Sequence, residues 1–328
     1  MPKHFHSLCL KATFCKVAFF LAVLTLITAC SAEQPHYAFI TNQLSDNVSV
    51  IDTETKQIIK TIPVGNRPAG VAASKNGKYV FISNPEGQDI SIIDTKTLQV
   101  IAHIPVGDGP VGIASNDDGS TVYVADWFQH KISVIDSQLQ SITTTIPVGK
   151  SPSGLIVHQA KQQLYVANRD DNNVMVINTT TNQVIDTIPV GTAPFGLALS
   201  PDGNTLYSVN VRSNNVSVID IDRAIVSTTI TVGEWPYCGV VSPDGHRLYV
   251  TNQDDSTVSV ISTLKGTVID TIDVGDSPEG IDITADSASL YVANWAAGTV
   301  SIIDTSTNEV ITTIKTNRGS RAFGQFIN

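Results

Sequence analysis

Charged residues are scarce in this chain: they make up 15% of its 328 residues, against 42% for apolar residues. Methionine occurs twice and tryptophan three times, whereas valine, isoleucine and threonine are abundant. β-Branched residues fit strands well and lose side-chain freedom in helices. The composition therefore favours packed β-structure and argues against a helical protein.

Short motifs that mark common catalytic and metal sites are also missing. The sequence has no GxSxG, HExxH or CxxC pattern. Histidines beyond residue 30 are spread over different parts of the chain, whereas a metal needs ligands that converge. We therefore predict no catalytic residue, no bound metal and no cofactor. The acidic stretches 169–172 and 253–256 leave a calcium ion open, although solvated turns explain them more simply.

The first thirty residues differ in composition from the rest. Three lysines and no acid precede an apolar run over 17–26, a pattern typical of an export signal and too short for a comfortable membrane span. The run ends in Leu-Ile-Thr-Ala-Cys, which resembles the lipobox of bacterial lipoproteins. The resemblance implies cleavage after residue 29, lipidation of Cys30 and, since Ser31 follows, the outer membrane rather than the inner one. A soluble secreted protein is the alternative.

Cysteine usage and charge limit the mature protein further. Cys9 and Cys15 would leave with the signal and Cys30 would carry lipid, so Cys238 alone remains and no internal disulfide can form. Loss of three lysines and no acid takes the formal charge from −10 to −13. This charge opposes nucleic acid as a partner. We expect a monomer in the cell envelope that meets the membrane only through its lipid anchor.

A repeat with a period of 42 residues fills the chain from residue 37 onwards. Its easiest marker is TIPVG at 61–65, which returns with small changes at every later copy and ends as TIKTN at 313–317. Each copy has four short apolar or alternating runs separated by turn sequences such as SPDG, which predicts four strands per copy. Periods near 40 indicate propellers or helical solenoids. Because the copies are predicted to consist of strands and not of helices, the sequence favours the propeller.

Proline and the chain ends predict the order of strands. Pro63, Pro105, Pro147 and Pro189 fall in the TIPVG run, and proline is tolerated mainly on sheet edges, so this strand should be outermost. The mature sequence begins with a second strand and ends, at 321–327, in the register of a first strand. The two ends should complete one blade together. We predict an all-β, seven-bladed propeller of four-stranded antiparallel blades over 37–328, after a signal peptide over 1–29 and a tether over 30–36.

The phrase LYVTN at 248–252, the SPDG turns and the TIPVG endings resemble the YVTN family of seven-bladed propellers, found in surface-layer and exported prokaryotic proteins. The resemblance covers residues 37–328. It implies the fold but little about function, because propellers carry unrelated sites. Propellers of similar appearance include lactonases, haem d1 carriers and proteins of quinone-cofactor pathways.

Positions at which the copies differ are the candidates for function. The loops that enter each first strand and those that join second to third strands share one face, which we call the top face; the opposite one is the bottom face. On the top face a column of Asn or Asp, from Asn42 to Asn294, should cap turns by bonding nearby backbone. Large aromatic and charged side chains on the same loops form our candidate binding site, because exposed aromatics are costly unless they cover or bind something. The candidates are Trp235, Tyr237, Phe195, Glu279, Arg321, Trp127, Trp295 and Arg169. Filling of the propeller axis by these aromatics is the alternative.

The stretch VGEWPYCGVVSPDG at 232–245 suggests a nucleophilic cysteine, but comparison with the other copies of the repeat argues against this role. Cys238 stands in a column of small residues, with glycine in most copies, and no histidine is predicted beside it. A buried inert thiol is therefore favoured.

Binding of an unidentified protein or small molecule on the top face is the function that these observations favour. Two alternatives remain open. One is an enzyme, either a lactonase-like hydrolase or an accessory protein to a periplasmic oxidoreductase; the other is a structural module of the surface-layer type.

Overall fold

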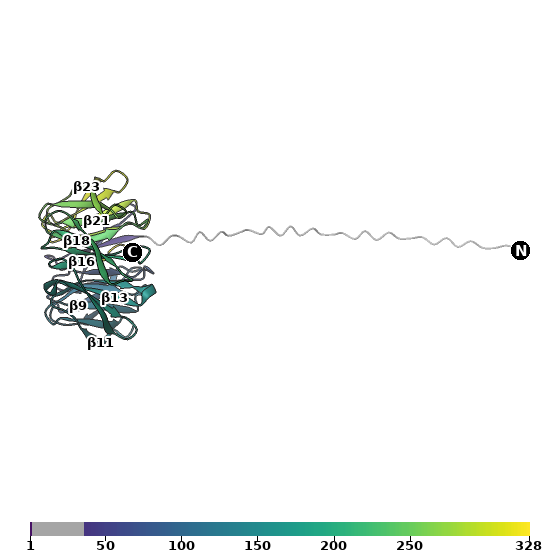
Figure 1. Ribbon diagram of the computed structural model, residues 1–328. Coiled ribbons are helices and arrows are strands. Elements are labelled where there is room, and N and C mark those ends of the chain that lie inside the picture. The colour runs from purple at the N-terminus through teal and green to yellow at the C-terminus, as the bar shows by residue number, and fades with distance from the viewer. Residues whose placement is uncertain (2–35) are drawn as a thin grey trace. The chain divides into compact units, whose positions relative to one another are not determined.

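The computed structural model describes residues 36–328 together with Met1. The predicted signal peptide and the predicted lipidation site Cys30 lie outside the described residues. Within them, short antiparallel strands form seven sheets, one for each 42-residue copy, and the predicted propeller is confirmed. In Figure 1, β9 and β11 lie at one end of the propeller and β23 at the other, with β16 and β18 between them.

We number the blades along the chain. Blade 1 holds β1 to β3, blade 2 holds β4 to β7, and each later blade holds the next four strands up to β27. From the axis outwards, a complete blade consists of an inner, a second, a third and an outer strand.

The inner strands are β4 (Val71–Ala73), β8 (Pro110–Ser115), β12 (Pro152–His158), β16 (Pro194–Leu199), β20 (Pro236–Val241) and β24 (Pro278–Ile283). The second strands are β1 (Tyr37–Asn42), β5 (Tyr79–Asn84), β9 (Thr121–Asp126), β13 (Gln163–Asn168), β17 (Thr205–Asn210), β21 (Arg247–Asn252) and β25 (Ser289–Asn294).

The third strands are β2 (Asn47–Asp52), β6 (Asp89–Asp94), β10 (Lys131–Asp136), β14 (Asn173–Asn178), β18 (Asn215–Asp220), β22 (Thr257–Ser262) and β26 (Thr299–Asp304). The outer strands are β3 (Gln57–Pro63), β7 (Gln99–Pro105), β11 (Ser141–Pro147), β15 (Gln183–Pro189), β19 (Ile225–Thr231), β23 (Thr267–Asp273) and β27 (Glu309–Lys315). Two short 3-10 turns complete the elements, η1 (Gln159–Lys161) and η2 (Arg169–Asp171). Neither has the length needed to cross a bilayer, and no other helix occurs among the described residues.

Small residues let the inner strands crowd around the axis. A Cβ atom added to Gly112 would lie 1.7 Å from the carbonyl oxygen of Ser153 in the next blade. Three buried hydroxyls in second strands reinforce this contact by donating to a carbonyl of the following blade: Thr41 to Ala69 (2.9 Å), Ser83 to Val111 (2.7 Å) and Thr251 to Glu279 (2.9 Å). Neighbouring blades are therefore joined by packing and by hydrogen bonds close to the axis.

The Asn column is structural, but its bonds differ from our expectation. Asn42 donates from Nδ2 to the side chains of Asn47 (2.8 Å) and Ser49 (2.9 Å) on the facing strand β2. Asn84 and Asn210 repeat the arrangement in their own blades. These amides thus tie β-hairpin strands together through side chains, and for them the predicted bond to nearby backbone was wrong. Asp126 does make it, because its carboxylate accepts from the amides of Phe128 (3.2 Å) and Gln129 (2.9 Å).

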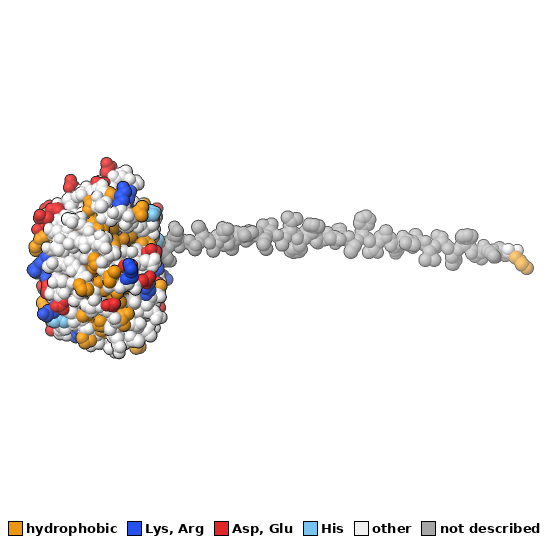
Figure 2. Space-filling model, in the orientation of Figure 1, with side chains coloured by type: hydrophobic (Ala, Val, Ile, Leu, Met, Phe, Trp, Pro, Cys, Tyr) orange, Lys and Arg blue, Asp and Glu red, His pale blue; other side chains and the backbone are white. Residues whose placement is uncertain are grey.

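Every outer strand contains a β-bulge at the same place. The pairing of third and outer strands skips one residue in each blade. The skipped residues are Ile59, Ile101, Thr143, Ile185, Ser227, Ile269 and Ile311. Five of them are isoleucines that stay 46–52% exposed, and Figure 2 shows hydrophobic side chains in patches among charged ones on the face in view. Bulges disturb the ladder of an open edge and so hinder pairing with another sheet edge.

Residues 320–328, the C-terminal segment, close the ring in the position predicted for them. The segment pairs with β1 in antiparallel bridges, Ala38 with Ile327 and Asn42 with Ser320. Between these bridges it leaves the extended conformation, because Ala322 and Gly324 have φ angles of 54° and 100°. The fourth strand of blade 1 is therefore two bridges instead of a continuous strand.

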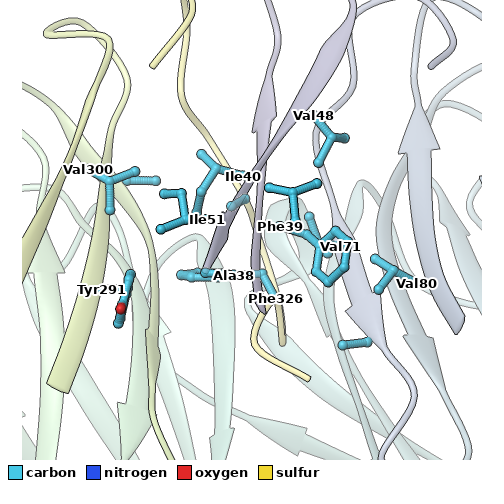
Figure 3. Packing of buried hydrophobic residues seen from close by; sticks show 14 of the residues in the cluster. Ala38, Phe39, Ile40, Val48, Ile51, Val71, Val80, Tyr291, Val300 and Phe326 are labelled. Atoms are coloured by element: carbon cyan, nitrogen blue, oxygen red, sulfur yellow. The ribbon is translucent and has the colours of Figure 1, made fainter. Parts of the chain in front are cut away.

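The segment is also bonded to the blades on both sides. Towards blade 2, the amides of Val71 and Ala73 donate to Phe323 O (2.7 Å) and Gln325 O (2.8 Å). Figure 3 shows Phe326 below β1, with Tyr291 and Val300 on one side of the cluster and Val71 and Val80 on the other. All of these side chains are fully buried. One segment thus joins three blades.

On the blade 7 side, a buried carboxylate holds the segment. Asp282 in β24 accepts hydrogen bonds from the amides of Phe326 (2.8 Å) and Ile327 (2.9 Å), and its other oxygen accepts from the amide of Ile283 (2.9 Å). Burial raises the pKa of Asp282 to about 6, and the three amides offset only part of this effect. The equivalent residues in other copies are apolar or glycine: Ala72, Ala114, Ile156, Ala198, Val240 and Gly324.

Asp282 should make the propeller more stable at pH 5 than at pH 7. Its pKa of about 6 in the folded protein lies above the unfolded value of about 3.9, so the folded state binds the proton more tightly. Stability is gained as the pH falls through 6 and is fully gained below about 4. From pH 7 to pH 5 the free energy of unfolding should rise by about 1 kcal/mol through this group.

Urea unfolding of the wild type and of Asp282→Asn at both pH values measures the effect. The rise should be smaller by this amount in the variant, and an identical pH dependence in the two proteins would contradict the assignment.

Candidate functional site

The candidate residues lie on the top face and most of them form one continuous group. Phe195, at the start of the inner strand of blade 5, contacts Tyr237 of blade 6, with ring centroids 4.4 Å apart. Both rings also contact Phe323 of the C-terminal segment, at 4.9 and 5.5 Å. Trp127 of blade 3 lies 6.4 Å from Phe195. We call these four side chains the aromatic band.

Two arginines flank the aromatic band. The guanidinium of Arg321 lies 4.9 Å from the Phe323 ring and 5.9 Å from the ring of Trp295. On the other side, Arg169 lies 5.8 Å from the ring of Trp127. Trp295 is fixed further by its indole N–H, which donates to Gln43 Oε1 at 3.0 Å. Such cation–π contacts hold the ends of the band in place.

A buried ion pair lies beside the band. Arg321 donates to both carboxylate oxygens of Glu279, from Nε at 2.5 Å and from Nη2 at 3.0 Å. Gln253 donates to the same carboxylate at 2.7 Å. Glu279 is 1% exposed, so its carboxylate has lost its hydration. The bidentate ion pair with Arg321 compensates for this loss. Burial alone would lower the pKa of Arg321, but the charge and the hydrogen bonds of Glu279, with smaller contributions from Tyr237 and Cys238, together outweigh burial and raise that pKa.

Exposure separates the side chains of the aromatic band and its neighbours into two groups. Phe195 and Phe323 are 5% and 6% exposed, so they fill the axis and offer little surface to a ligand. Trp127, Tyr237, Trp295 and the two arginines are half-buried around them. Much of the band is therefore core, and the alternative that aromatics fill the axis describes its centre well.

Trp235 stands apart from the band. It lies in the loop that enters blade 6, and its side chain is 46% exposed. Its backbone has a φ of 50°, in the left-handed region that bulky residues rarely adopt. The same position is left-handed in five other entering loops, where smaller or more flexible side chains stand: Arg67, Ser151, Ala193, Ser277 and Gly319.

The backbone of Trp235 is held by two hydrogen bonds while its ring is left outside. Its amide donates to Asn214 Oδ1 (3.1 Å), and its carbonyl accepts from the amide of Gln253 (3.0 Å). No hydrogen bond or aromatic contact with the described residues is made by the indole. Phe128, in the loop after β9, is the other strongly exposed aromatic of this face, at 68%, and its ring lies over Gly109.

The thiol and hydroxyl groups of this region are poorly suited to act as nucleophiles. Burial raises the pKa of the Cys238 thiol, and the negative charge of Glu279 adds to the effect, so the thiol stays protonated. Burial likewise raises the pKa of the Tyr237 hydroxyl to about 12. Cys238 is 7% exposed, as its place in the small-residue column predicted. Among the described residues, no group of three or more His, Cys, Asp or Glu side chains is placed to hold a metal ion.

Phe323 and Asp282 were not among the residues predicted from the sequence. Phe323 replaces the Val71, Ile113, Leu155, Leu197, Gly239 or Ile281 of the other copies, so it is the only aromatic in its column. A search for such single departures inside inner strands would have found both residues. Our candidates came from loop positions only.

Two family models match parts of the chain. Residues 32–161 match a model described as YNCE-like β-propeller, and residues 137–229 match one described as lactonase, 7-bladed β-propeller. Neither match spans half of the chain. Over the matched residues the chain is similar to YNCE-like β-propellers and to the seven-bladed lactonase propeller. No curated protein matches the sequence at a significant level.

Solved structures share the fold at low identity. Hydrazine synthase of Kuenenia stuttgartiensis matches with a TM-score of 0.71 and 23% identity over 77% of this chain and 87% of its own. A functionally unknown protein from Desulfotomaculum acetoxidans DSM 771 gives 0.76 and 17% over 88% and 99%. The dihydro-haem d1 dehydrogenase NirN, in complex with DHE, gives 0.66 and 17% over 88% of this chain and 65% of its own. Identities this low support the fold and no function.

Removal of Arg321 should be strongly destabilising because it leaves Glu279 buried and without its cation. Arg321→Met should lower the free energy of unfolding by about 3–5 kcal/mol. Combining it with Glu279→Leu should restore at least half of the loss, because no buried charge then remains.

Denaturant unfolding measures all three proteins, with Arg318→Met at an exposed position of the same loop as the control. An Arg321→Met protein as stable as this control would show that the ion pair does not stabilise the fold.

Proposed function

We propose that this protein is a binding module of the cell envelope that recognises a protein or a small molecule through the rim of its top face. Trp235 carries the proposal. A tryptophan that has left-handed backbone and is 46% exposed costs free energy and gains few contacts. Exposed aromatics with such a cost are typical of recognition surfaces.

The structure around Trp235 supports a role as a fixed anchor. Its two backbone hydrogen bonds and the proline that follows hold the loop in one conformation. A preorganised aromatic loses little freedom on binding. The half-buried Tyr237 two residues later connects this rim to the aromatic band. The band itself supplies a rigid base, and we assign it support instead of direct recognition.

Trp235→Ser should remove binding without loss of stability. Serine stands at the equivalent position in two other blades, Ser151 and Ser277, so the loop accepts it. We expect the free energy of unfolding to stay within about 1 kcal/mol of the wild type. Recovery of the partner from envelope extract, or binding of a ligand once found, should fall at least tenfold.

Arg67→Ser, at the same position of blade 2, is the matched control and should keep full binding. Equal recovery by wild type, Trp235→Ser and this control would refute the assignment of Trp235.

We further propose attachment to the membrane through Cys30. His36 lies at the bottom face, where its carbonyl accepts from the amide of Thr53 (3.1 Å). A chain from Cys30 to His36 spans at most about 20 Å. The anchor would therefore hold the bottom face close to the membrane and leave the top face with Trp235 directed away from it.

Cys30→Ser should move the protein out of the membrane fraction of the cells that produce it, whereas Cys15→Ser should leave it there. Fractionation followed by immunoblotting measures both. Persistence of Cys30→Ser in the membrane fraction would rule out the anchor.

A lactonase-like hydrolase is the second candidate, because residues 137–229 match the lactonase propeller model. The protonated states of Cys238 and Tyr237 give it no support. Turnover of lactones by the purified protein would favour this candidate over binding.

A further inference from the structure

A cavity of about 300 Å³ lies on the bottom face between blades 6 and 7. One side is the turn between β20 and β21 with the start of β21, which carry Asp244, His246, Arg247 and Tyr249. Ser287 and Thr305 line the other side. Its volume is at the lower end of the range for ligand sites. The cavity lies on the opposite face from Trp235 and has no part in the top-face binding proposed above.

Arg247 is held in place at one edge of its guanidinium. Its Nη1 donates to the backbone oxygen of Thr305 (2.5 Å) and to Asn308 Oδ1 (3.3 Å), both in blade 7. Nε and Nη2 make no hydrogen bond with the described residues. A guanidinium fixed in this way presents a second pair of donors with a geometry that suits two oxygens of one anion.

The His246 and Arg247 pair is specific to this blade. At the position of Arg247 the other copies have Tyr37, Tyr79, Thr121, Gln163, Thr205 and Ser289. Since the fold forms six times without this arginine, its presence in blade 6 calls for a local reason. The hydrogen bonds of Nη1, which join blades 6 and 7, give a structural role to one edge of the guanidinium. They give none to the edge formed by Nε and Nη2.

Tyr249 provides a second donor that the fold leaves without an acceptor. It is 1% exposed and lines the cavity. In the next blade, the equivalent hydroxyl of Tyr291 donates to the carbonyl of Thr53 at 3.3 Å. The corresponding carbonyl for Tyr249 is that of Thr305, which Arg247 already occupies. The hydroxyl of Tyr249 accepts a long 3.5 Å contact from Arg247 and donates to no acceptor among the described residues.

Two further donors complete the lining. The hydroxyl of Ser287 and the exposed ring of His246 make no side-chain hydrogen bond with the described residues. Asp244 is the one acid in the lining. Its carboxylate is engaged with the Ser242 hydroxyl (2.5 Å) and the His246 amide (2.9 Å), and the Ser242 bond is the main cause that holds its pKa below the usual range.

We propose that this cavity binds a small tetrahedral oxyanion, either free phosphate or the phosphate group of a small monoester. Arg247 supplies the charge and paired donors, and the Tyr249 and Ser287 hydroxyls supply neutral hydrogen bonds. The half-buried position strengthens these bonds relative to open solvent. The volume of about 300 Å³ accommodates a phosphate together with a small substituent.

Isothermal titration calorimetry of the full-length protein with inorganic phosphate and with methyl phosphate tests the site. We expect saturable binding of one ion per chain. Arg247→Met should lower the affinity at least about tenfold, since hydrogen bonds to a charged group are lost. Arg223→Met, which removes an exposed arginine from the same face, should leave it unchanged. Tighter binding of phosphate than of its methyl ester would identify the free ion as the ligand, and the reverse would identify a monoester.

Two milder variants keep the test valid if Arg247→Met unfolds. Tyr249→Phe preserves the buried ring and should weaken binding about two- to tenfold. Asp244→Asn keeps the turn bonds and should strengthen binding roughly two- to fivefold by removing a like charge.

Absence of saturable binding would overturn the proposal, as would affinities that Arg247→Met and Tyr249→Phe do not change. Weaker phosphate binding by Asp244→Asn would also overturn it, because the site would then favour a cation or a neutral ligand.

Discussion

Closure of the ring by residues 320–328 is the interaction on which the rest of this structure depends. A propeller with a strand missing from one blade would expose sheet edges on both sides of the gap, and such edges are aggregation hazards. In this protein the C-terminal segment bonds to β1, to β4 and, through Asp282, to β24. The same segment carries Arg321 and Phe323 to the axis of the top face. The centre of the candidate site therefore forms only when the C-terminal segment has paired with β1.

Much of the fold could be predicted from the sequence because the pattern of each strand and turn recurs in seven copies. Where the pattern of one copy is ambiguous, the equivalent positions of the other six indicate the element. The prolines that recur in the TIPVG run were therefore enough to place the outer strands. What the repeat could not supply were contacts made once. Asp282 reads as an ordinary strand residue until the structure shows which amides donate to it. Phe195 reads as a loop aromatic until its contacts with Tyr237 and Phe323 bury it. The Asn column was placed correctly at the hairpin ends, but a backbone cap and a side-chain bond to the facing strand have the same sequence signature.

Departures from the repeat fall into two kinds in this protein. Some complete the structure at its one irregular point, as Asp282, Phe323 and the Glu279 and Arg321 pair do around the ring closure. Others carry groups whose presence the contacts among the described residues do not explain. Trp235 has a strained backbone and an exposed side chain, and Arg247 has donors that find no acceptor among the described residues. Function is best sought in the second kind, because structural necessity already accounts for the first. The two proposed sites lie on opposite faces, so each can be changed without touching the other.

Native-state hydrogen exchange of the Phe326 and Ile327 amides tests most directly whether closure by the C-terminal segment holds the propeller together. Chain termini usually exchange by local fraying, at free energies of opening far below that of global unfolding. Our account predicts that these two amides exchange only when the propeller unfolds, with an opening free energy equal to that of the amides of β1. Exchange at a rate close to that of an unstructured chain, while β1 stays protected, would show that the segment is an accessory and that the ring holds without it.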